Sequence, residues 1–137
     1  MTAGLRHEKG QQAPVQQRAK VFQRADRLKG VGTMKHLIVF AHPNAASFCA
    51  AVRDAYIAAL KKGGNEIEVI DLYAENFKAT LDRQDFAALA EKNTPDDIKY
   101  AQAKVAWAEV ITFISPIWWM SFPAMLKGFI DRVFTKG

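Results

Sequence analysis

The stretch KHLIVFA, from Lys35 to Ala41, decides the fold of this 137-residue chain. Its apolar residues follow one another without the polar–apolar alternation of a half-exposed strand. A continuous run of this kind is typical of a parallel strand that is covered on both faces. We therefore expect a central strand here, with an α/β architecture built around it.

The segment after this strand predicts a helix and then a second strand. Ser47 is a favourable N-cap for a helix over Phe48–Lys62, and the pair Gly63–Gly64 is typical of a helix end. The run EIEVIDL, Glu66–Leu72, alternates more than the first strand and indicates a position nearer the sheet edge. Helical spacing assigns the buried face of the helix to Phe48, Ala51, Val52, Ala55, Ala59 and Leu60.

The second half of the chain repeats this alternation. We expect a short helix over Arg83–Lys92 and a longer one that runs to about Ala108. Thr94 is the expected N-cap of the longer helix, with Pro95 as its first helical residue. The run VITFIS, Val110–Ser115, predicts a third buried strand.

The last helix is expected to begin near Pro123, and its Asp131 and Arg132 are most simply a solvated or interface pair. The order of elements is then β-α-β-(α)-α-β-α, which predicts parallel pairing and a doubly wound α/β sheet. The chain stops at Gly137, directly after a helix, where the next strand should begin. We expect a domain cut after its third strand and the following helix. The apolar stripe of that helix comprises Met125, Leu126, Phe129, Ile130, Val133 and Phe134.

The net charge of +5 is confined to one end of the chain. Residues 1–33 contain seven Lys and Arg and two acidic residues, whereas residues 34–137 contain twelve basic and twelve acidic residues. A nucleic-acid-binding domain should carry its basic surface on the folded body, so we expect no nucleic-acid partner. Residues 1–33 predict a basic, disordered extension that precedes a domain over residues 34–137.

Composition also bears on other classes of protein. No run approaches the roughly 18 apolar residues of a membrane helix, so we expect no membrane span. Cys49 is the only cysteine and no signal peptide is visible, which makes a reducing cytoplasm the expected location. The His, Cys, Asp and Glu residues show no metal-ligand spacing, so no metal is expected.

Two loops qualify as a ligand site, because doubly wound sheets bind ligands beyond the carboxyl ends of their strands. The first loop, from His42 to Cys49, follows the first strand and opens a helix. Free N–H groups at a helix N-terminus, the helix dipole and the Ser47 hydroxyl can together bind phosphate or pyrophosphate. The loop lacks the glycines of a dinucleotide-binding or P-loop motif, and the alternative is that Ser47 is only a helix cap.

The second loop, from Ser115 to Pro123, offers a flat aromatic platform. Trp118 and Trp119 lie between two prolines that stiffen the loop. The two rings either hold a planar ring system or fill the core or a subunit interface, and the sequence leaves both readings open. Together the two loops suit a ligand with a negative tail and a flat aromatic head, such as a flavin nucleotide.

Three motifs carry a resemblance to one family. They are AHPNAASF (Ala41–Phe48), DLYAENF (Asp71–Phe77) and PIWWMSFPAMLKGFIDRVF (Pro116–Phe134). Through them, residues 34–137 resemble the N-terminal part of the flavodoxin-like NAD(P)H dehydrogenase (quinone) family. That family includes quinone reductases and the ancillary oxidoreductases of bacterial potassium-efflux systems.

The resemblance implies a flavodoxin-like fold and a homodimeric, flavin-dependent reductase. In such enzymes NAD(P)H reduces FAD or FMN and leaves, and a quinone-like acceptor then takes the hydride. The cofactor carries the redox chemistry while the protein binds and orients it. The resemblance also implies the cofactor-binding residues, which are His42, Ser47, Phe48 and Cys49 near the phosphates and Pro116, Ile117, Trp118 and Trp119 along the isoalloxazine.

Part of the family pattern is not found in this sequence. Relatives continue into a fourth strand, a Gly-Gly loop against the flavin, and Tyr and His residues that assist hydride transfer. The resemblance therefore assigns no catalytic residue, and His42 is by itself more typical of a structural hydrogen-bonding residue. The alternatives are an inactive fragment, a non-catalytic flavodoxin-like electron carrier, or a regulatory partner of a potassium-efflux system.

Overall fold

The structure is a computed structural model and describes residues 32–134. The extension predicted over residues 1–33 therefore lies outside the described residues, apart from Gly32 and Thr33.

The described residues contain three strands and four helices in the predicted order, but the third strand, predicted to be buried, is only partly buried. The predicted α/β class and the parallel sheet are both confirmed. The elements are β1 (Lys35–Phe40), α2 (Phe48–Lys62), β2 (Glu66–Asp71), α3 (Arg83–Ala90), α4 (Asp96–Trp107), β3 (Val110–Ile114) and α5 (Ala124–Val133).

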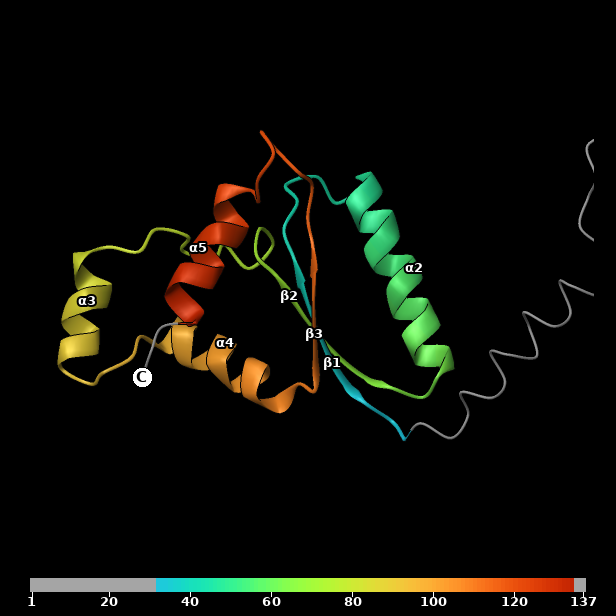
Figure 1. The fold of residues 1–137 in the computed structure, drawn as a ribbon, viewed down its shortest axis with the longest axis horizontal. Helices are drawn as coiled ribbons and strands as arrows, with labels where there is room; N and C mark the ends of the chain where they lie inside the picture. Colours follow the sequence, from blue (N-terminus) through green and yellow to red (C-terminus); the bar gives the residue numbers. More distant parts are fainter. Residues whose placement is uncertain (1–31, 135–137) are drawn as a thin grey trace, which may run out of the picture. The chain divides into compact units, whose positions relative to one another are not determined.

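The sheet has the strand order β2-β1-β3, with β1 in the centre. Both pairings are parallel, and Val39 of β1 lies opposite Ile70 of β2 and Phe113 of β3. The position of β2 at the edge agrees with its more alternating sequence. Because all three strands point the same way, the loops after β1 and β3 emerge at the same end of the sheet (Figure 1).

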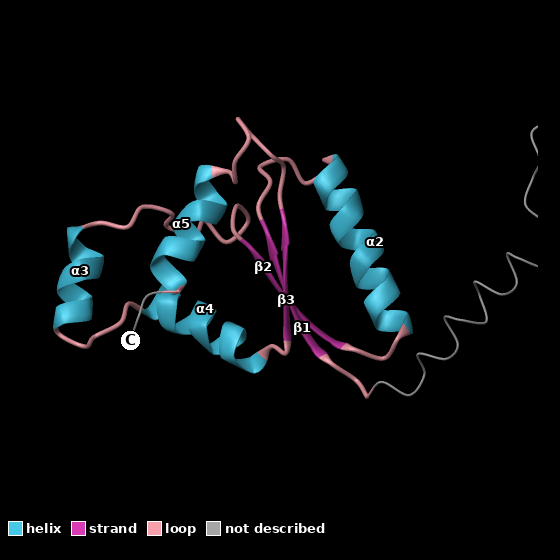
Figure 2. Cartoon of the chain, in the orientation of Figure 1, coloured by secondary structure: helices cyan, strands magenta, loops and turns pink. Residues whose placement is uncertain are grey.

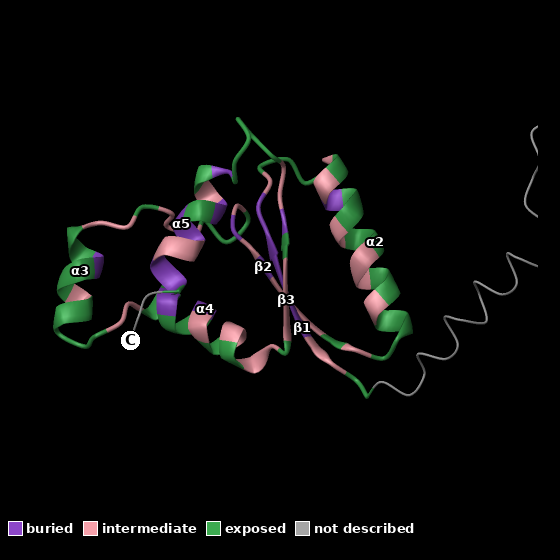
Figure 3. Cartoon of the chain, viewed as in Figure 1, coloured by how far each residue is buried: buried purple, intermediate pink, exposed green. Residues whose placement is uncertain are grey.

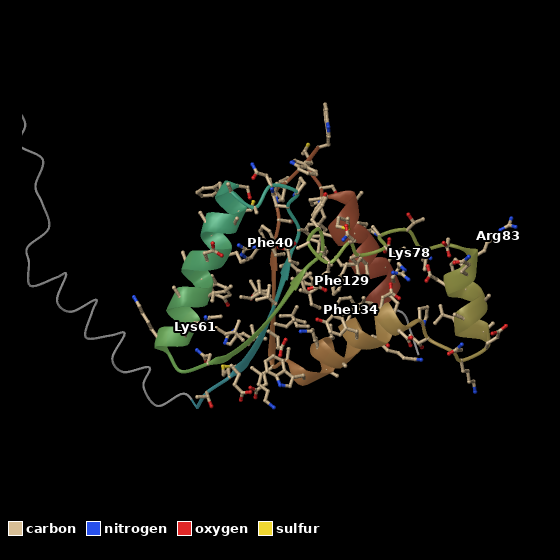
Figure 4. All side chains as sticks on the ribbon, turned by 180° about the vertical axis from the view of Figure 1, so that it is seen from behind. Phe40, Lys61, Lys78, Arg83, Phe129 and Phe134 are labelled. Atoms are coloured by element: carbon tan, nitrogen blue, oxygen red, sulfur yellow. The ribbon has the colours of Figure 1, made fainter. Side chains whose placement is uncertain are left out.

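The helices cover the sheet from two sides (Figure 2). Helix α2 lies on one face, where Phe40 packs, and α4 and α5 lie on the other, where Phe129 packs (Figure 4). On α5, Leu126, Phe129 and Val133 are buried at helical spacing. Burial of each such side chain contributes about 1.5–3 kcal/mol, which explains why α5 holds its position on the sheet.

The predicted apolar face of α2 is wrong except at Leu60, which does pack on the sheet, and most of the helix surface is exposed or half-buried (Figure 3). Phe48 is 83% exposed and Val52 is 41% exposed, whereas Ala50 is buried. Arg53 of α2 faces the sheet instead, with its guanidinium carbon 4.5 Å from the centre of the Phe40 ring. The residues that pack on this side of the sheet are Cys49, Ala50, Tyr56, Ile57 and Leu60.

Two smaller predictions on the second half are also corrected. Pro95, with a ψ of 149°, is the N-cap of α4, so Thr94 is not the cap and Pro95 is not the first helical residue. Arg132 is 3% exposed rather than solvated, and it pairs with Asp85 and Asp97. Asp131 does lie at the surface side of α5, where it pairs with Lys127.

Candidate functional site

The loop after β1 is a tight polar turn that leads into α2. The Asn44 side chain accepts a hydrogen bond from the Ala46 amide at 2.9 Å, and the Asn44 carbonyl accepts one from the Ser47 amide at 3.1 Å. The Ser47 hydroxyl then accepts from the Ala50 amide at 3.2 Å and caps the helix. The first amides of α2, at Phe48 and Cys49, are left without an intrahelical acceptor and point out of the N-terminus.

His42 is anchored at the start of this turn. Its Nδ1 lies 2.9 Å from the amide nitrogen of Asn44 and 3.1 Å from the Asn44 carbonyl oxygen. Its ring also packs against Trp118 of the second loop, with 6.2 Å between ring centroids and an interplanar angle of 59°. The structure therefore brings the two predicted loops into contact through His42 and Trp118.

The second loop forms a two-residue hairpin turn. The amides of Trp118 and Ser121 each donate to the carbonyl of the other, both at 3.0 Å. The two central residues, Trp119 and Met120, have φ angles of 50° and 61°. Positive φ at both central positions is the signature of a type I′ turn, which normally selects Asn-Gly because other L-residues are strained there.

The tip of this hairpin is exposed. Trp119 is 100% exposed, Met120 98% and Trp118 43%, so neither tryptophan ring fills the core of the described domain. The flanking Ile117 and Phe122 are exposed as well. Of the readings left open by the sequence, a ligand platform and a subunit interface both agree with these exposed rings.

A cleft of about 310 Å³ opens beside His42, at the carboxyl ends of β1 and β2. Asp71, which lines it, accepts a hydrogen bond from the Ala74 amide at 3.1 Å and pairs with Arg53 at 3.4 Å. Arg53 and the Ala74 amide therefore offset the negative charge of the Asp71 carboxylate, which then does not strongly repel an anion near His42. The full lining is His42, Pro43, Ala45, Asp71, Tyr73 and Ala74.

The predicted cofactor-binding residues occupy one end of the sheet but differ in their surroundings. Ser47 acts as the helix cap, and Cys49 is partly buried against the core on the α2 side. Phe48 and Ile117 are largely exposed, and Pro116 is half-buried. Sequence reasoning missed Asn44, although an Asn directly after a Pro, four residues past the end of β1, is a recognisable signal for a side-chain-capped turn.

These groups fit a flavin nucleotide chemically. The free amides at the start of α2 and the His42 ring offer hydrogen-bond donors to phosphate oxygens. The exposed rings of Trp118 and Trp119 offer an apolar surface to a planar ring. Within residues 32–134, no group of three or more His, Cys, Asp or Glu side chains is arranged to hold a metal ion.

Comparison with known families identifies the chain. A family described as having a flavodoxin-like fold matches residues 34–137, and the chain belongs to this family. This match confirms the resemblance that the three sequence motifs indicate.

Individual relatives agree with this assignment. The chain is 36% identical over 118 residues to NAD(P)H dehydrogenase [quinone] 1 of Cavia porcellus, covering 74% of this chain and 43% of the relative. It is 37% identical over 120 residues to a ribosyldihydronicotinamide dehydrogenase-like protein of Penicillium crustosum, covering 76% and 45%. The solved structure of an NAD(P)H:quinone oxidoreductase from Methanothermobacter marburgensis matches with a TM-score of 0.70 at 34% identity, covering 76% and 54%.

The chain spans about half the length of the curated relatives that it matches. In the part of the chain that the structure describes, no helix combines the length and the apolar character needed to cross a membrane.

Proposed function

We propose that this chain forms the flavin-binding part of an NAD(P)H:quinone oxidoreductase. The contact between His42 and Trp118 carries the proposal, because it joins a phosphate-binding turn to an aromatic platform at one end of the sheet. The names of the relatives, which include NAD(P)H dehydrogenase [quinone], supply the donor and acceptor classes.

The residues divide into two groups. His42, Ser47 and the amides of Phe48 and Cys49 would bind the phosphate or pyrophosphate of FAD or FMN. Pro116, Ile117, Trp118 and Trp119 would lie along the isoalloxazine and keep water from it. When bound, the flavin would supply two-electron transfer from NAD(P)H to a quinone-like acceptor.

Two further features are proposed with this function. The exposed hydrophobic residues of the hairpin and its flanks, which are Ile117, Trp118, Trp119, Met120 and Phe122, support assembly as a homodimer. The cytoplasmic location expected from the single cysteine, Cys49, stays a prediction.

The first experiment is a flavin titration of the purified chain. FAD and FMN are added separately, free flavin is removed by gel filtration, and the visible absorption of the protein fraction is measured. We expect one of the two flavins to remain with the protein. A Trp118→Ala, Trp119→Ala double variant should retain at least about fivefold less flavin than the wild type, since aromatic stacking on a base contributes about 1–3 kcal/mol.

The outcomes separate the proposal from its alternatives. Retained flavin together with NADH- or NADPH-dependent quinone reduction supports the oxidoreductase. Retained flavin that exchanges electrons with a protein partner but not with NAD(P)H supports a carrier instead. A chain that stays colourless with both flavins contradicts flavin binding by residues 34–137 and favours an inactive fragment.

A further inference from the structure

We infer that Asn44 and Trp118 are positioning residues that hold His42 as a hydrogen-bond donor through Nε2–H. This role rests on the proposed flavin site, because it describes how one of its residues is prepared to bind a phosphate oxygen. Two contacts carry it, one from each of the two loops that meet at His42.

The backbone of Asn44 determines which ring nitrogen of His42 carries the proton. The Asn44 amide nitrogen lies 2.9 Å from His42 Nδ1. A backbone amide always carries its hydrogen, so the nitrogen that it approaches acts as the acceptor. The Asn44 carbonyl oxygen is also 3.1 Å from Nδ1, but a proton on Nδ1 would be directed against the amide hydrogen. The neutral ring therefore carries its proton on Nε2.

The same turn ties His42 to the start of α2. Asn44 is itself held by the Ala46 amide on its side-chain oxygen and by the Ser47 amide on its carbonyl. Ser47 caps the helix. The imidazole and the first helical amides are therefore parts of one hydrogen-bonded turn, and their donors can serve the same anion.

Trp118 restrains the ring from the other loop. Its indole packs on the imidazole at 6.2 Å between centroids, and its backbone is fixed by the two 3.0 Å bonds with Ser121. The turn is closed by two residues in the left-handed region, Trp119 and Met120. Strain of this kind persists only where the surrounding structure fixes the backbone, and the hairpin that contains these two residues also holds Trp118 against His42.

The tautomer can be measured without any flavin. We would record two-bond ¹H–¹⁵N spectra of the full chain with ¹⁵N-labelled histidine at about pH 8.5, above the titration range of an unperturbed imidazole. The His42 signals are assigned from their loss in His42→Gln. We expect protonated Nε2 and unprotonated Nδ1. A ring protonated on Nδ1, or an even mixture of tautomers, would overturn the inference.

Matched variants test each positioning residue in the same spectra. Asn44→Ala keeps the backbone amide and should keep the tautomer, whereas Asn44→Pro removes the amide hydrogen and should shift the ring toward a mixture. Trp118→Phe should preserve the wild-type tautomer and line widths, and Trp118→Ala should broaden the cross-peaks or mix the tautomers. An unchanged tautomer in Asn44→Pro together with unchanged tautomer and line widths in Trp118→Ala would contradict the positioning role.

The flavin affinity of His42 variants tests whether Nε2–H of His42 donates a hydrogen bond to the flavin. A Gln side chain places its amide near the position of Nε2, and an Asn side chain places its amide near Nδ1. We expect His42→Gln to keep the flavin dissociation constant within about threefold and His42→Asn to raise it at least about tenfold, as for a lost hydrogen bond to a charged group. The control is Phe86→Ala. Phe86 is an exposed aromatic residue on α3, and its loss should not change the flavin dissociation constant.

The results that would overturn the role of His42 differ from those that would overturn the proposed function. Equal losses in His42→Gln and His42→Asn would overturn the role of Nε2–H while the flavin site itself stands. A wild-type chain that binds neither FAD nor FMN would contradict the proposed function. In that case the spectra of the unliganded chain still decide whether Asn44 and Trp118 position His42.

Discussion

Arg132 of α5 and Asp85 of α3 form a buried ion pair with two hydrogen bonds. Arg132 Nη2 lies 2.7 Å from Asp85 Oδ1, and Nε lies 3.2 Å from Oδ2. The Arg132 side chain is 2% exposed and that of Asp85 is 7% exposed. Arg132 Nη1 also donates to Asp97 of α4 at 2.6 Å and to the Lys78 carbonyl at 2.7 Å. One side chain thereby links α3, α4, α5 and the segment before α3.

This pair predicts a loss of stability in acid. Hydrogen bonds from the Arg132 guanidinium, opposed by burial, lower the pKa of Asp85 to about 2. An unfolded Asp titrates near about 3.9, so the folded state binds the proton less readily than the unfolded state. The stabilising contribution is therefore complete above about pH 4 and is lost as the pH falls toward about 2. Urea unfolding across about pH 2–7 measures it.

Asp85→Asn should remove both the pair and its share of the pH dependence. At pH 7 we expect the free energy of unfolding to fall by about 3 kcal/mol, because Arg132 is left buried with only Asp97 as a carboxylate partner. The difference from wild type should shrink toward pH 2. Two curves that stay parallel over the whole range would show that Asp85 does not titrate as proposed.

Asp131→Asn is the matched control, an Asp→Asn change at an exposed ion pair on α5, the helix that carries Arg132. Asp131 pairs with Lys127 at i,i+4 on α5, and both side chains are more than a third exposed. A pair of this kind contributes about 0.3–0.5 kcal/mol, so the variant should unfold almost as the wild type does. A loss as large as that of Asp85→Asn would mean that the local helix, and not the buried pair, is being measured.

Gly128 predicts a second sensitive position. A Cβ added to this residue of α5 would lie 1.9 Å from the carbonyl oxygen of Ala79 and 2.6 Å from its carbonyl carbon. Since backbone atoms cannot rotate away, Gly128→Ala should destabilise the domain by at least about 1–3 kcal/mol. Gly32→Ala, where a Cβ meets nothing within 4 Å, is the control and should stay within about 0.5 kcal/mol. Thermal unfolding of both variants decides the point.

The elements were predictable where local signals determine them. The cap at Ser47 and the glycines at 63 and 64 give α2 the bounds that the sequence predicts. The continuous apolar run of β1 correctly predicts a strand buried at the centre of a parallel sheet. Parallel strands also place the two predicted loops at one end, so the location of the candidate site follows from the fold.

The sequence did not predict the features that depend on contacts between residues far apart in the chain. Arg132 looks solvated in the sequence because its partners Asp85 and Asp97 precede it by 47 and 35 residues. The face predicted for α2 also missed that Arg53 lies over the Phe40 ring, a contact that helical spacing does not indicate. At the site, the turn at Trp118 to Ser121 carries no Asn-Gly signal, so its shape and its contact with His42 were not predictable.

That turn leads to a prediction in which stability and binding change in opposite directions. Trp119 and Met120 both adopt positive φ, which costs about 1–2 kcal/mol for an L-residue with a Cβ. A Trp119→Asn, Met120→Gly double variant supplies the residues that a type I′ turn prefers. Because the replaced side chains are almost fully exposed, little packing is lost. The free energy of unfolding should rise by about 1 kcal/mol.

The same double variant should bind flavin less tightly, because it lacks the Trp119 ring proposed to lie along the isoalloxazine. Met120→Gly alone separates the two effects: it relieves strain at one position and keeps both tryptophans, so stability should rise while flavin affinity stays near wild type. The measurements are urea unfolding and flavin titration of each variant. A destabilised Met120→Gly would show that the left-handed backbone at this position is not strained. An unchanged flavin affinity in the double variant would remove Trp119 from the proposed site and leave Trp118 as its aromatic contact.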